Sequence, residues 1–382
     1  MKVVVPRELA EGETRVAATP RTVKRMDRAG LEVHVEAGAG QASGITDSEF
    51  TEAGATLIED RATLFAGSEI ILCVKPPDPE TITQMPSGAF LIAVLDPLIE
   101  HEVVTQLADR GVSAFSLDMV PRIARAQSMD VLSSMSTLTG YQAVLLAAMA
   151  LPGVMPYLTT AAGTLHPSKV LVLGAGVAGL QAIATARRLG ALVWGYDIRP
   201  VVKEQVESLG AEFLELIDTS DAAEDAGGYA KEQSQDQAAE QQRAMTAHLA
   251  EMDAVITTAL IPGRPAPILL TTEMVEAMKP GSVIVDLAVE NGGNCALSEM
   301  GKVVEVNGVK IIGHANFPAR LAVDASSLYA RNLFNFLSPH IDGETGGLSL
   351  DFEDETVSGV CLTRDGAVIH LMLTADLLTA EC

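Results

Sequence analysis

Three glycines in the segment Gly174–Gly179, sequence GAGVAG, have the spacing of a phosphate-binding turn. The segment follows the apolar run 169–173, a predicted strand, and opens a helix-like stretch that ends before Gly190. The first glycine of such a turn permits the bend, the second lets the backbone approach a pyrophosphate, and the third lets the helix pack on the sheet. Helix N–H groups then face the phosphates. We therefore predict a dinucleotide site; the alternative is a helix that merely packs closely through its glycines.

An acidic residue ends the next predicted strand, 191–196. A carboxylate at this position accepts hydrogen bonds from the ribose hydroxyls of NAD and disfavours the 2′-phosphate of NADP. Asp197 therefore predicts NAD as the preferred cofactor, and Arg199, two residues later, weakens that preference slightly.

A second group of polar side chains lies in Pro121–Asp130, sequence PRIARAQSMD, with Ser133 and Ser134 behind it. The segment joins two predicted units, and ligands in such folds bind in clefts between units. Arg122 could pair with Asp130 or grip a phosphate or carboxylate. A solvated helix N-terminus is an equally good interpretation.

Candidate general acids and bases are few. The seven histidines are scattered without a clear acidic partner, so we expect structural roles for them. Arg15 and Lys75 could bind a carboxylate substrate or be ordinary surface charges. Asp286 and Glu290 lie where a predicted strand meets a glycine turn, which suits either catalysis or capping.

The elements that must position these residues repeat one pattern. In the first half, predicted helices at 20–29 and 102–110 alternate with strands at 2–5, 31–36, 69–74, 90–95 and 112–117. In the second half, predicted helices at 176–189 and 201–209 alternate with strands at 169–173, 191–196, 254–260, 282–287 and 309–312. This alternation predicts an α/β chain of two Rossmann-like, doubly wound parallel-sheet domains with a cleft between them.

We place the first domain at residues 1–132 and 324–382, and the NAD(H)-binding domain at 133–323. A helix predicted over 323–337 returns the chain to the first domain, and Arg364-Asp365-Gly366 signals a hairpin turn. The polar segment 218–251 predicts a mobile surface loop, about 218–235, followed by a solvated helix.

Composition limits the possible partners. The chain has 382 residues with 50 acidic and 26 basic side chains, a net charge of −24, and 48% hydrophobic residues. The apolar fraction excludes global disorder, and the charge makes nucleic acid or an anionic membrane surface an improbable partner. The acidic, Lys-poor balance also suits a salt-rich cytoplasm. The four cysteines are far apart, so neither a metal site nor a redox dithiol is predicted.

One segment, 131–168, contains no charged residue. A charge gap of this length can mark a membrane span. The continuous apolar run, 143–151, is short, and Pro152, Gly153 and Pro156 break it. We therefore predict a buried helix that connects the two domains.

Taken together, the motifs resemble the soluble NAD(H)-binding component, the first domain or alpha subunit, of proton-translocating nicotinamide nucleotide transhydrogenases. The likeness runs through nearly the whole chain. It is carried by Arg15–Pro20, Arg122–Asp130, Thr160–Gly163, Gly174–Ala186, Lys203–Gly210, Gly227–Lys231, Thr257–Gly263 and Asp286–Cys295.

The resemblance implies a role for each motif. Arg122, Gln127, Asp130 and Ser133 would hold the nicotinamide end of NAD(H), with Gln127 nearest the two nicotinamides. Arg122, Gln127 and Asp130 would form the catalytic group. The other implied cofactor contacts are Gly174, Ala175, Gly176, Val177 and Gly179 at the pyrophosphate, Asp197, Ile198 and Arg199 at the adenosine ribose, Gly228 and Tyr229 in a closing loop, and Leu260. From the residues alone, an exposed bystander is the favoured interpretation of Tyr229, and a lid residue that closes on a ligand is the alternative.

The resemblance also implies partners and a location. The component would be a homodimer that docks on a separate NADP(H)-binding domain and a membrane proton-channel subunit. Hydride would pass directly from NADH to NADP⁺, Re/Si-specifically, so the site needs positioning rather than an acid or base. Because the chain reaches Cys382 without membrane helices, we expect one cytoplasmic subunit, peripheral to the inner face of the cytoplasmic membrane through its partners.

Alanine dehydrogenase, of the same fold family, is the rival. Arg15 and Lys75 match its pyruvate-binding arginine and lysine, but Asp96 stands where it has a catalytic histidine and Glu290 where it has an aspartate. Amino-acid chemistry is hard to run without that histidine, so the departure favours the transhydrogenase. A regulator that binds NADH without transferring hydride is a third class.

Overall fold

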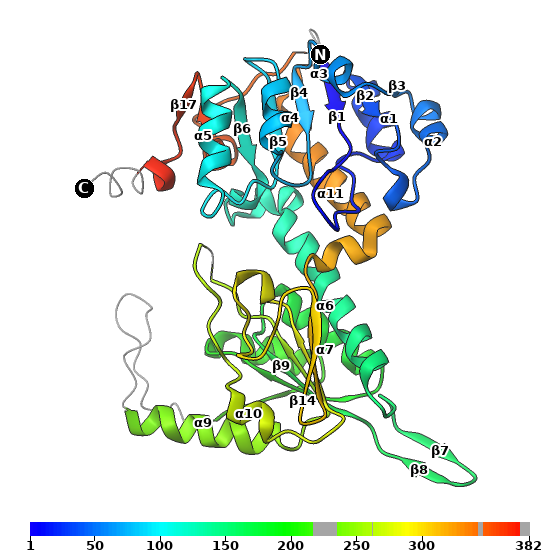
Figure 1. Ribbon diagram of the computed structural model, residues 1–382, viewed down its shortest axis with the longest axis vertical. Helices are drawn as coiled ribbons and strands as arrows, with labels where there is room; N and C mark the ends of the chain where they lie inside the picture. The colour runs from blue at the N-terminus through cyan, green and yellow to red at the C-terminus, as the bar shows by residue number, and fades with distance from the viewer. Residues whose placement is uncertain (217–234, 262, 343–346, 375–382) are drawn as a thin grey trace. The chain divides into compact units, whose positions relative to one another are not determined.

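The computed structural model describes residues 1–216, 235–261, 263–342 and 347–374 (Figure 1). The chain divides into two compact units. The first unit contains residues 1–135 and 318–382, and the second contains residues 136–317.

The first unit is built on a six-stranded sheet in which every described strand pair is parallel. Its strands are β1 (Lys2–Val5), β2 (Glu32–Glu36), β3 (Thr56–Ile58), β4 (Ile70–Leu72), β5 (Phe90–Ala93) and β6 (Ser113–Ser116). Its helices include α1 (Pro20–Arg28), α2 (Asp47–Glu52), α3 (Arg61–Phe65), α4 (Pro79–Gln84), α5 (His101–Asp109), α11 (Ala322–Leu337) and α12 (Glu355–Ser358). The strands order as β3-β2-β1-β4-β5-β6.

The second unit repeats this topology and adds one antiparallel edge strand. Its sheet contains β9 (Lys169–Leu173), β10 (Leu192–Tyr196), β11 (Glu212–Phe213), β12 (Ala254–Thr257), β13 (Val283–Asp286), β14 (Lys302–Val306) and β15 (Val309–Gly313). Its helices include α7 (Val177–Arg188), α8 (Lys203–Ser208), α9 (Gln235–Leu249) and α10 (Thr272–Glu276). The order is β11-β10-β9-β12-β13-β15-β14.

Both sheets therefore have the strand order of the doubly wound fold, which confirms the predicted fold class. The central strands are continuous apolar runs, such as Val3–Val5 and Val170–Leu173, because helices cover both faces of the sheet. In each sheet the order reverses between the first and fourth strands, β1 and β4 or β9 and β12. Ligands of this fold bind beyond the carboxyl ends of those strands.

Several elements differ from the prediction. The strand expected over 254–260 ends at Thr257, because the next residues turn away to bond the loops after β9 and β13. The edge strands β3, β11 and β14 were not predicted. Neither was the hairpin of β7 (Leu158–Thr160) and β8 (Gly163–Leu165), whose six residues are all exposed and so lack the alternation that marks a strand.

Helix α6 (Val131–Ala150) occupies the uncharged segment. We predicted a buried helix, but Leu132, Tyr141 and Met149 are exposed, Met149 by 85%. Among the described residues, α6 is the one helix long and apolar enough to cross a membrane, a test that the core helix of a soluble protein also passes. Its burial is partial: 33% of its most apolar stretch lies inside the structure.

Candidate functional site

The glycine turn 174–179 joins β9 to α7 at the switch point of the second sheet. Gly174 has φ +95°, which a side chain would strain, and a Cβ there would lie 2.5 Å from Thr258 Oγ1. A Cβ on Gly179 would lie 1.8 Å from the Gly174 carbonyl oxygen. By contrast, a Cβ on Gly176 would meet nothing within 4 Å. Gly174 and Gly179 thus allow close packing, and Gly176 faces open space.

The amino end of α7 can receive an anion. Gly176 is its N-cap and gives no side-chain hydrogen bond, so the first N–H groups of the helix have no side-chain acceptor at the cap. The helix has 12 residues, and Val177 at its start is 44% exposed. Free N–H groups and the positive end of the helix dipole favour phosphate. The open space beside Gly176 therefore fits a pyrophosphate.

Asp197 follows β10, and its carboxylate lies against this turn. The Ala175 N–H donates to Oδ2 at 2.8 Å, so the acid and the glycine turn are in direct contact. Arg199 donates through its backbone N–H and Nε to Oδ1 and through Nη2 to Oδ2, at 2.9–3.0 Å. Burial alone would raise the pKa of Asp197, but the hydrogen bonds from Arg199 and Ala175 outweigh it and lower the pKa.

These contacts bear on ribose recognition. Each carboxylate oxygen of Asp197 already accepts two donors, so its lone pairs are filled. A ribose diol would have to replace the Arg199 guanidinium, whose side chain is 56% exposed.

The loop after β12 completes this edge of the second sheet. The Thr258 hydroxyl lies 3.1 Å from the Gly174 carbonyl and 3.3 Å from that of Leu173, and it donates to them. Leu260 and Ile261 are exposed by 53% and 45%, although they are large apolar side chains. Ile198, after β10, is 81% exposed. The second unit thus presents exposed apolar side chains on the loops that follow β10 and β12.

The predicted nicotinamide segment lies in the first unit, as the short helix η3 (Ala124–Met129) and the start of α6. Asp130 caps α6: its carboxylate accepts from the backbone N–H of Ser133 at 2.8 Å and from the Ser133 hydroxyl. Arg122 is exposed, and the ion pair of this segment is formed by Arg125 instead. Asp130 therefore acts as the cap of a helix N-terminus, which was the alternative interpretation of this segment. The hydrogen bonds described for the Asp130 carboxylate involve Ser133 and not Arg122.

Two anchors hold η3 in place. Arg125 makes two hydrogen bonds to Asp354, at 2.6 and 2.7 Å, and with Thr356 these hold the pKa of that carboxyl well below its usual range. On the other side, the Ser128 carbonyl accepts from the side-chain amides of Asn332 and Asn335 of α11. Between these anchors the side chain of Gln127 is exposed. The segment therefore presents Gln127 from a fixed backbone.

Two predicted residues, Gly228 and Tyr229, lie outside the described residues. The rest fall into two sets, one in each unit. In the second unit Asp197 is hydrogen-bonded to the glycine turn, and in the first unit Ser133 is hydrogen-bonded to Asp130.

A further polar cluster, which we did not predict as a whole, lies at the switch point of the first sheet. Glu8, just after β1, accepts from the N–H groups of Val74 at 2.6 Å and Lys75 at 3.2 Å. Burial raises the pKa of Glu8 to about 7 despite these bonds. Arg15 pairs with Glu13 at 2.6 Å. An acid directly after the first strand was the available signal.

Glu8 makes stability depend on pH. Its pKa is about 7 when folded and 4.5 ordinarily, so between these values the folded state holds the extra proton. The free energy of unfolding should therefore fall by roughly 3 kcal/mol as pH rises from 4.5 to 7, and then level off. Urea denaturation at several pH values should show this slope in the wild type and lose it in Glu8→Gln. The exposed Glu11→Gln variant should keep it, and an unchanged slope in Glu8→Gln would refute the assignment.

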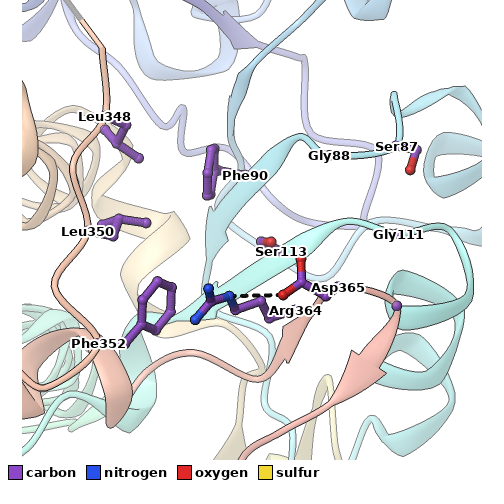
Figure 2. Close-up of a pocket in the computed structure, with 11 residues that line it drawn as sticks. Ser87, Gly88, Phe90, Gly111, Ser113, Leu348, Leu350, Phe352, Arg364 and Asp365 are labelled. Carbon is purple, nitrogen blue, oxygen red and sulfur yellow. Dashed lines mark ion pairs between the residues drawn. The ribbon is translucent and has the colours of Figure 1, made fainter.

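The hollow shown in Figure 2 is a different feature of the first unit. It has a volume of about 610 Å³ and lies where β5 and β6 begin, at Phe90 and Ser113. Arg364 stacks 4.0 Å over the Phe352 ring and pairs with Asp365 at 3.2 Å. Ligands of this fold bind at the carboxyl ends of the strands, whereas this hollow lies at the ends where the strands begin. It contains no predicted site residue.

Comparison with known families decides the relationship. The family model described as "Alanine dehydrogenase/PNT, N-terminal domain" matches residues 4–139, and "Alanine dehydrogenase/PNT, C-terminal domain" matches residues 143–371. The chain belongs to the alanine dehydrogenase/PNT family. This confirms the predicted resemblance.

Within this family, the chain is similar to an NAD(P) transhydrogenase alpha-subunit polypeptide of Rhodospirillum rubrum, at 50% identity over 98% of this chain and 100% of that relative. It is 46% identical to NAD(P) transhydrogenase subunit alpha of Haemophilus influenzae, over 97% of this chain and 72% of the relative. Alanine dehydrogenase of Halomonas elongata is 32% identical, over 84% and 82%.

Solved structures agree with these sequence relationships. A transhydrogenase from Sinorhizobium meliloti superposes with a TM-score of 0.87 at 47% identity, covering 97% of this chain and 100% of that one. An L-alanine dehydrogenase superposes with a TM-score of 0.81 at 26% identity, covering 99% of both chains. The alanine dehydrogenase/PNT fold is therefore shared along nearly the whole chain.

Proposed function

We propose that this chain is the NAD(H)-binding subunit of a Re/Si-specific, proton-translocating transhydrogenase. The observation that carries the proposal is the array at the switch point of the second sheet, where the uncapped end of α7 and Asp197 meet at Ala175. In support, 50% of the aligned residues are identical to the Rhodospirillum rubrum transhydrogenase polypeptide, along its entire length.

The residues of the chain would bind and orient the nucleotide. The N–H groups that open α7 hold the pyrophosphate, and Asp197 takes the adenosine ribose after Arg199 leaves. Leu260 and Ile198 offer apolar contacts, and Gly228 and Tyr229 close over the nucleotide. Arg122, Gln127, Asp130 and Ser133 hold the nicotinamide end. The cofactor supplies the hydride chemistry, so the protein contributes position and needs no acid or base.

The remaining components of the reaction would belong to partners. NADP⁺ sits on a separate NADP(H)-binding domain and accepts hydride directly from NADH on this chain. That domain belongs to a membrane proton-channel subunit, which couples the transfer to proton translocation. The chain then lies on the cytoplasmic face of the membrane and contacts it only through these partners.

Hydride transfer to a partner is the decisive test. The purified chain is mixed with NADH, an NADP⁺ analogue of distinct absorbance, and a matching NADP(H)-binding domain. Rapid transfer that requires both proteins is the expected result. If NADH binds without transfer, consumption of NADH with pyruvate and ammonia would identify an alanine dehydrogenase, and its absence a regulator.

The same proposal includes a homodimer, which the uncharged segment 131–168 supports. This stretch keeps seven large apolar side chains exposed: Leu132, Tyr141, Met149, Val154, Tyr157, Leu158 and Leu165. Its hairpin β7–β8 extends from the body of the second unit (Figure 1), and an isolated two-stranded hairpin is marginally stable in water. In a two-fold dimer the same surface of both copies meets, so a chain of net charge −24 associates with least repulsion through a segment that carries no charge.

The dimer makes a prediction about Met149, which is 85% exposed on α6. Met149→Glu would bring negative charge into the apolar contact, and like charges at an interface cost several kcal/mol. We expect the dimer dissociation constant to rise at least about 100-fold, measured by analytical ultracentrifugation. Met300→Glu, at a methionine 63% exposed elsewhere in the second unit, is the control and should stay dimeric. A Met149→Glu dimer of unchanged affinity would place the interface elsewhere.

A further inference from the structure

Asp286, the last residue of β13, is a fully buried carboxylate surrounded by hydrogen-bond donors. Oδ1 accepts from the Thr257 hydroxyl and the Ala288 N–H, both at 3.0 Å. Oδ2 accepts from the N–H groups of Asn294 and Cys295 and from the Ser298 hydroxyl, at 2.7–3.0 Å. No lysine or arginine is among these partners. The donors come from β12 and from the loop after β13, so the carboxylate ties that loop to the neighbouring strand.

The glycine turn at 292–293 is shaped around this carboxylate. Both glycines have positive φ, +97° and +86°. A Cβ on Gly293 would lie 2.9 Å from Asp286 Oδ2, closer than real Cβ contacts come. The turn therefore serves to bring the backbone of Asn294 onto Asp286 and fixes where the Asn294 side chain begins.

The buried side chain of Asn294 then reaches the loop after β12. Its Oδ1 accepts from the Ala259 N–H at 2.9 Å, and its Nδ2 donates to the carbonyls of Ala259 at 2.9 Å and Pro267 at 2.8 Å. The amide thus holds both backbone groups of Ala259, as a neighbouring strand would. Every hydrogen of the amide group is used, so its position is fixed.

Ala259 lies between Thr258, which contacts the glycine turn, and the exposed Leu260. Thr258, before it, donates to the carbonyl of Gly174, and Leu260, after it, is exposed at the carboxyl edge of the sheet. A buried carboxylate costs free energy unless donors satisfy it, and the five donors here offset that cost rather than add net stability. What the polar array supplies instead is a single position for residues 258–260 relative to the glycine turn.

We propose that Asp286 and Asn294 are positioning residues, which set the 258–260 loop against the dinucleotide without touching it. The inference rests on the proposed NADH site and adds two residues to it. Asp286 then has a capping role rather than a catalytic one, because it holds the loop after β13 that positions residues 258–260.

The test is a double-mutant cycle on NADH binding to the intact chain, in which binding is measured by the fluorescence of the nucleotide. Asn294→Ala should weaken NADH binding about 10-fold, and Leu260→Ala should do the same. If Asn294 acts through Leu260, the double variant should also lose about 10-fold, rather than about 100-fold. In the coupled assay with the NADP(H)-binding domain, Asn294→Ala should raise KM for NADH about 10-fold with kcat unchanged, because uniform binding is lost.

A stability control separates positioning from general damage. Thr271 caps α10 in the same unit through the Met274 N–H, so Thr271→Ala should lower Tm and leave the NADH Kd unchanged. Should Asn294→Ala fail to fold, Asn294→Asp keeps an acceptor for the Ala259 N–H, loses both donations, and should still weaken binding several-fold. Additive effects in the cycle, or an unchanged Kd in a folded Asn294 variant, would overturn the inference. Absence of NADH binding by the wild type would instead overturn the proposed function.

Discussion

Asp197→Ala should weaken NADH binding about 100-fold and at the same time improve NADPH binding. The carboxylate is the acceptor for the ribose hydroxyls, and hydrogen bonds to a charged group contribute about 1.5–3 kcal/mol each. Its removal also frees Arg199, which now makes three hydrogen bonds to Asp197. A released guanidinium beside the ribose suits a 2′-phosphate. Fluorescence titration of the isolated chain with each nucleotide would measure both changes.

A matched control removes a similar ion pair from the opposite edge of the same sheet. Asp253, just before β12, pairs with Lys279 at 2.6 Å and accepts from the Lys169 N–H. Asp253→Ala should leave both nucleotide affinities within about twofold, because it lies at the amino ends of the strands. If Asp197→Ala leaves the NADH affinity and the NAD/NADP preference unaltered, Asp197 has no role at the ribose.

Gln127→Asn should slow hydride transfer about 100-fold and leave NADH affinity largely intact. The substitution keeps the amide but shortens the side chain by one methylene, and a misplacement of about 1 Å at a reacting centre can cost 10²-fold. The anchors of η3 on Asp354 and α11 prevent the backbone from moving to compensate. Single-turnover transfer to the NADP(H)-binding domain, monitored by stopped flow, would measure the rate.

A second glutamine of the first unit serves as the control for this substitution. Gln106 on α5 donates to Glu102 one helical turn earlier, and neither residue belongs to the predicted nicotinamide segment. Gln106→Asn should therefore transfer hydride at the wild-type rate. An unchanged rate in Gln127→Asn would remove Gln127 from its proposed role.

The glycine turn and Asp197 could be predicted because their context is local. A strand, the turn and a helix follow one another within about twenty residues, and the acid ends the next strand. The doubly wound, parallel class of each sheet followed from the alternation of strands and helices. Short edge strands such as β3 and β11 carry too few buried residues to produce a pattern.

The polar array around Asp286 could not be predicted as a whole, because its two long-range contacts, to Thr257 and to Ala259, form only where neighbouring strands pair in parallel. Thr257 lies 29 residues away in sequence and reaches Asp286 only because β12 and β13 pair in that register. Asn294 meets Ala259 across 35 residues for the same reason. The sequence does contain a cue in the two consecutive glycines before Asn294, but glycine pairs occur in many turns that bury no carboxylate.

The caged carboxylate of Asp286 also has a consequence for how the second unit comes apart. Local segments of a fold often open one at a time, each with its own free energy of opening. If β12, the 292–295 turn or the end of β13 opened alone, the buried carboxylate of Asp286 would lose part of its hydrogen-bond donors. We therefore expect these segments to unfold cooperatively, together with the sheet. A local opening that admits and releases a ligand then has to involve segments of the chain other than these.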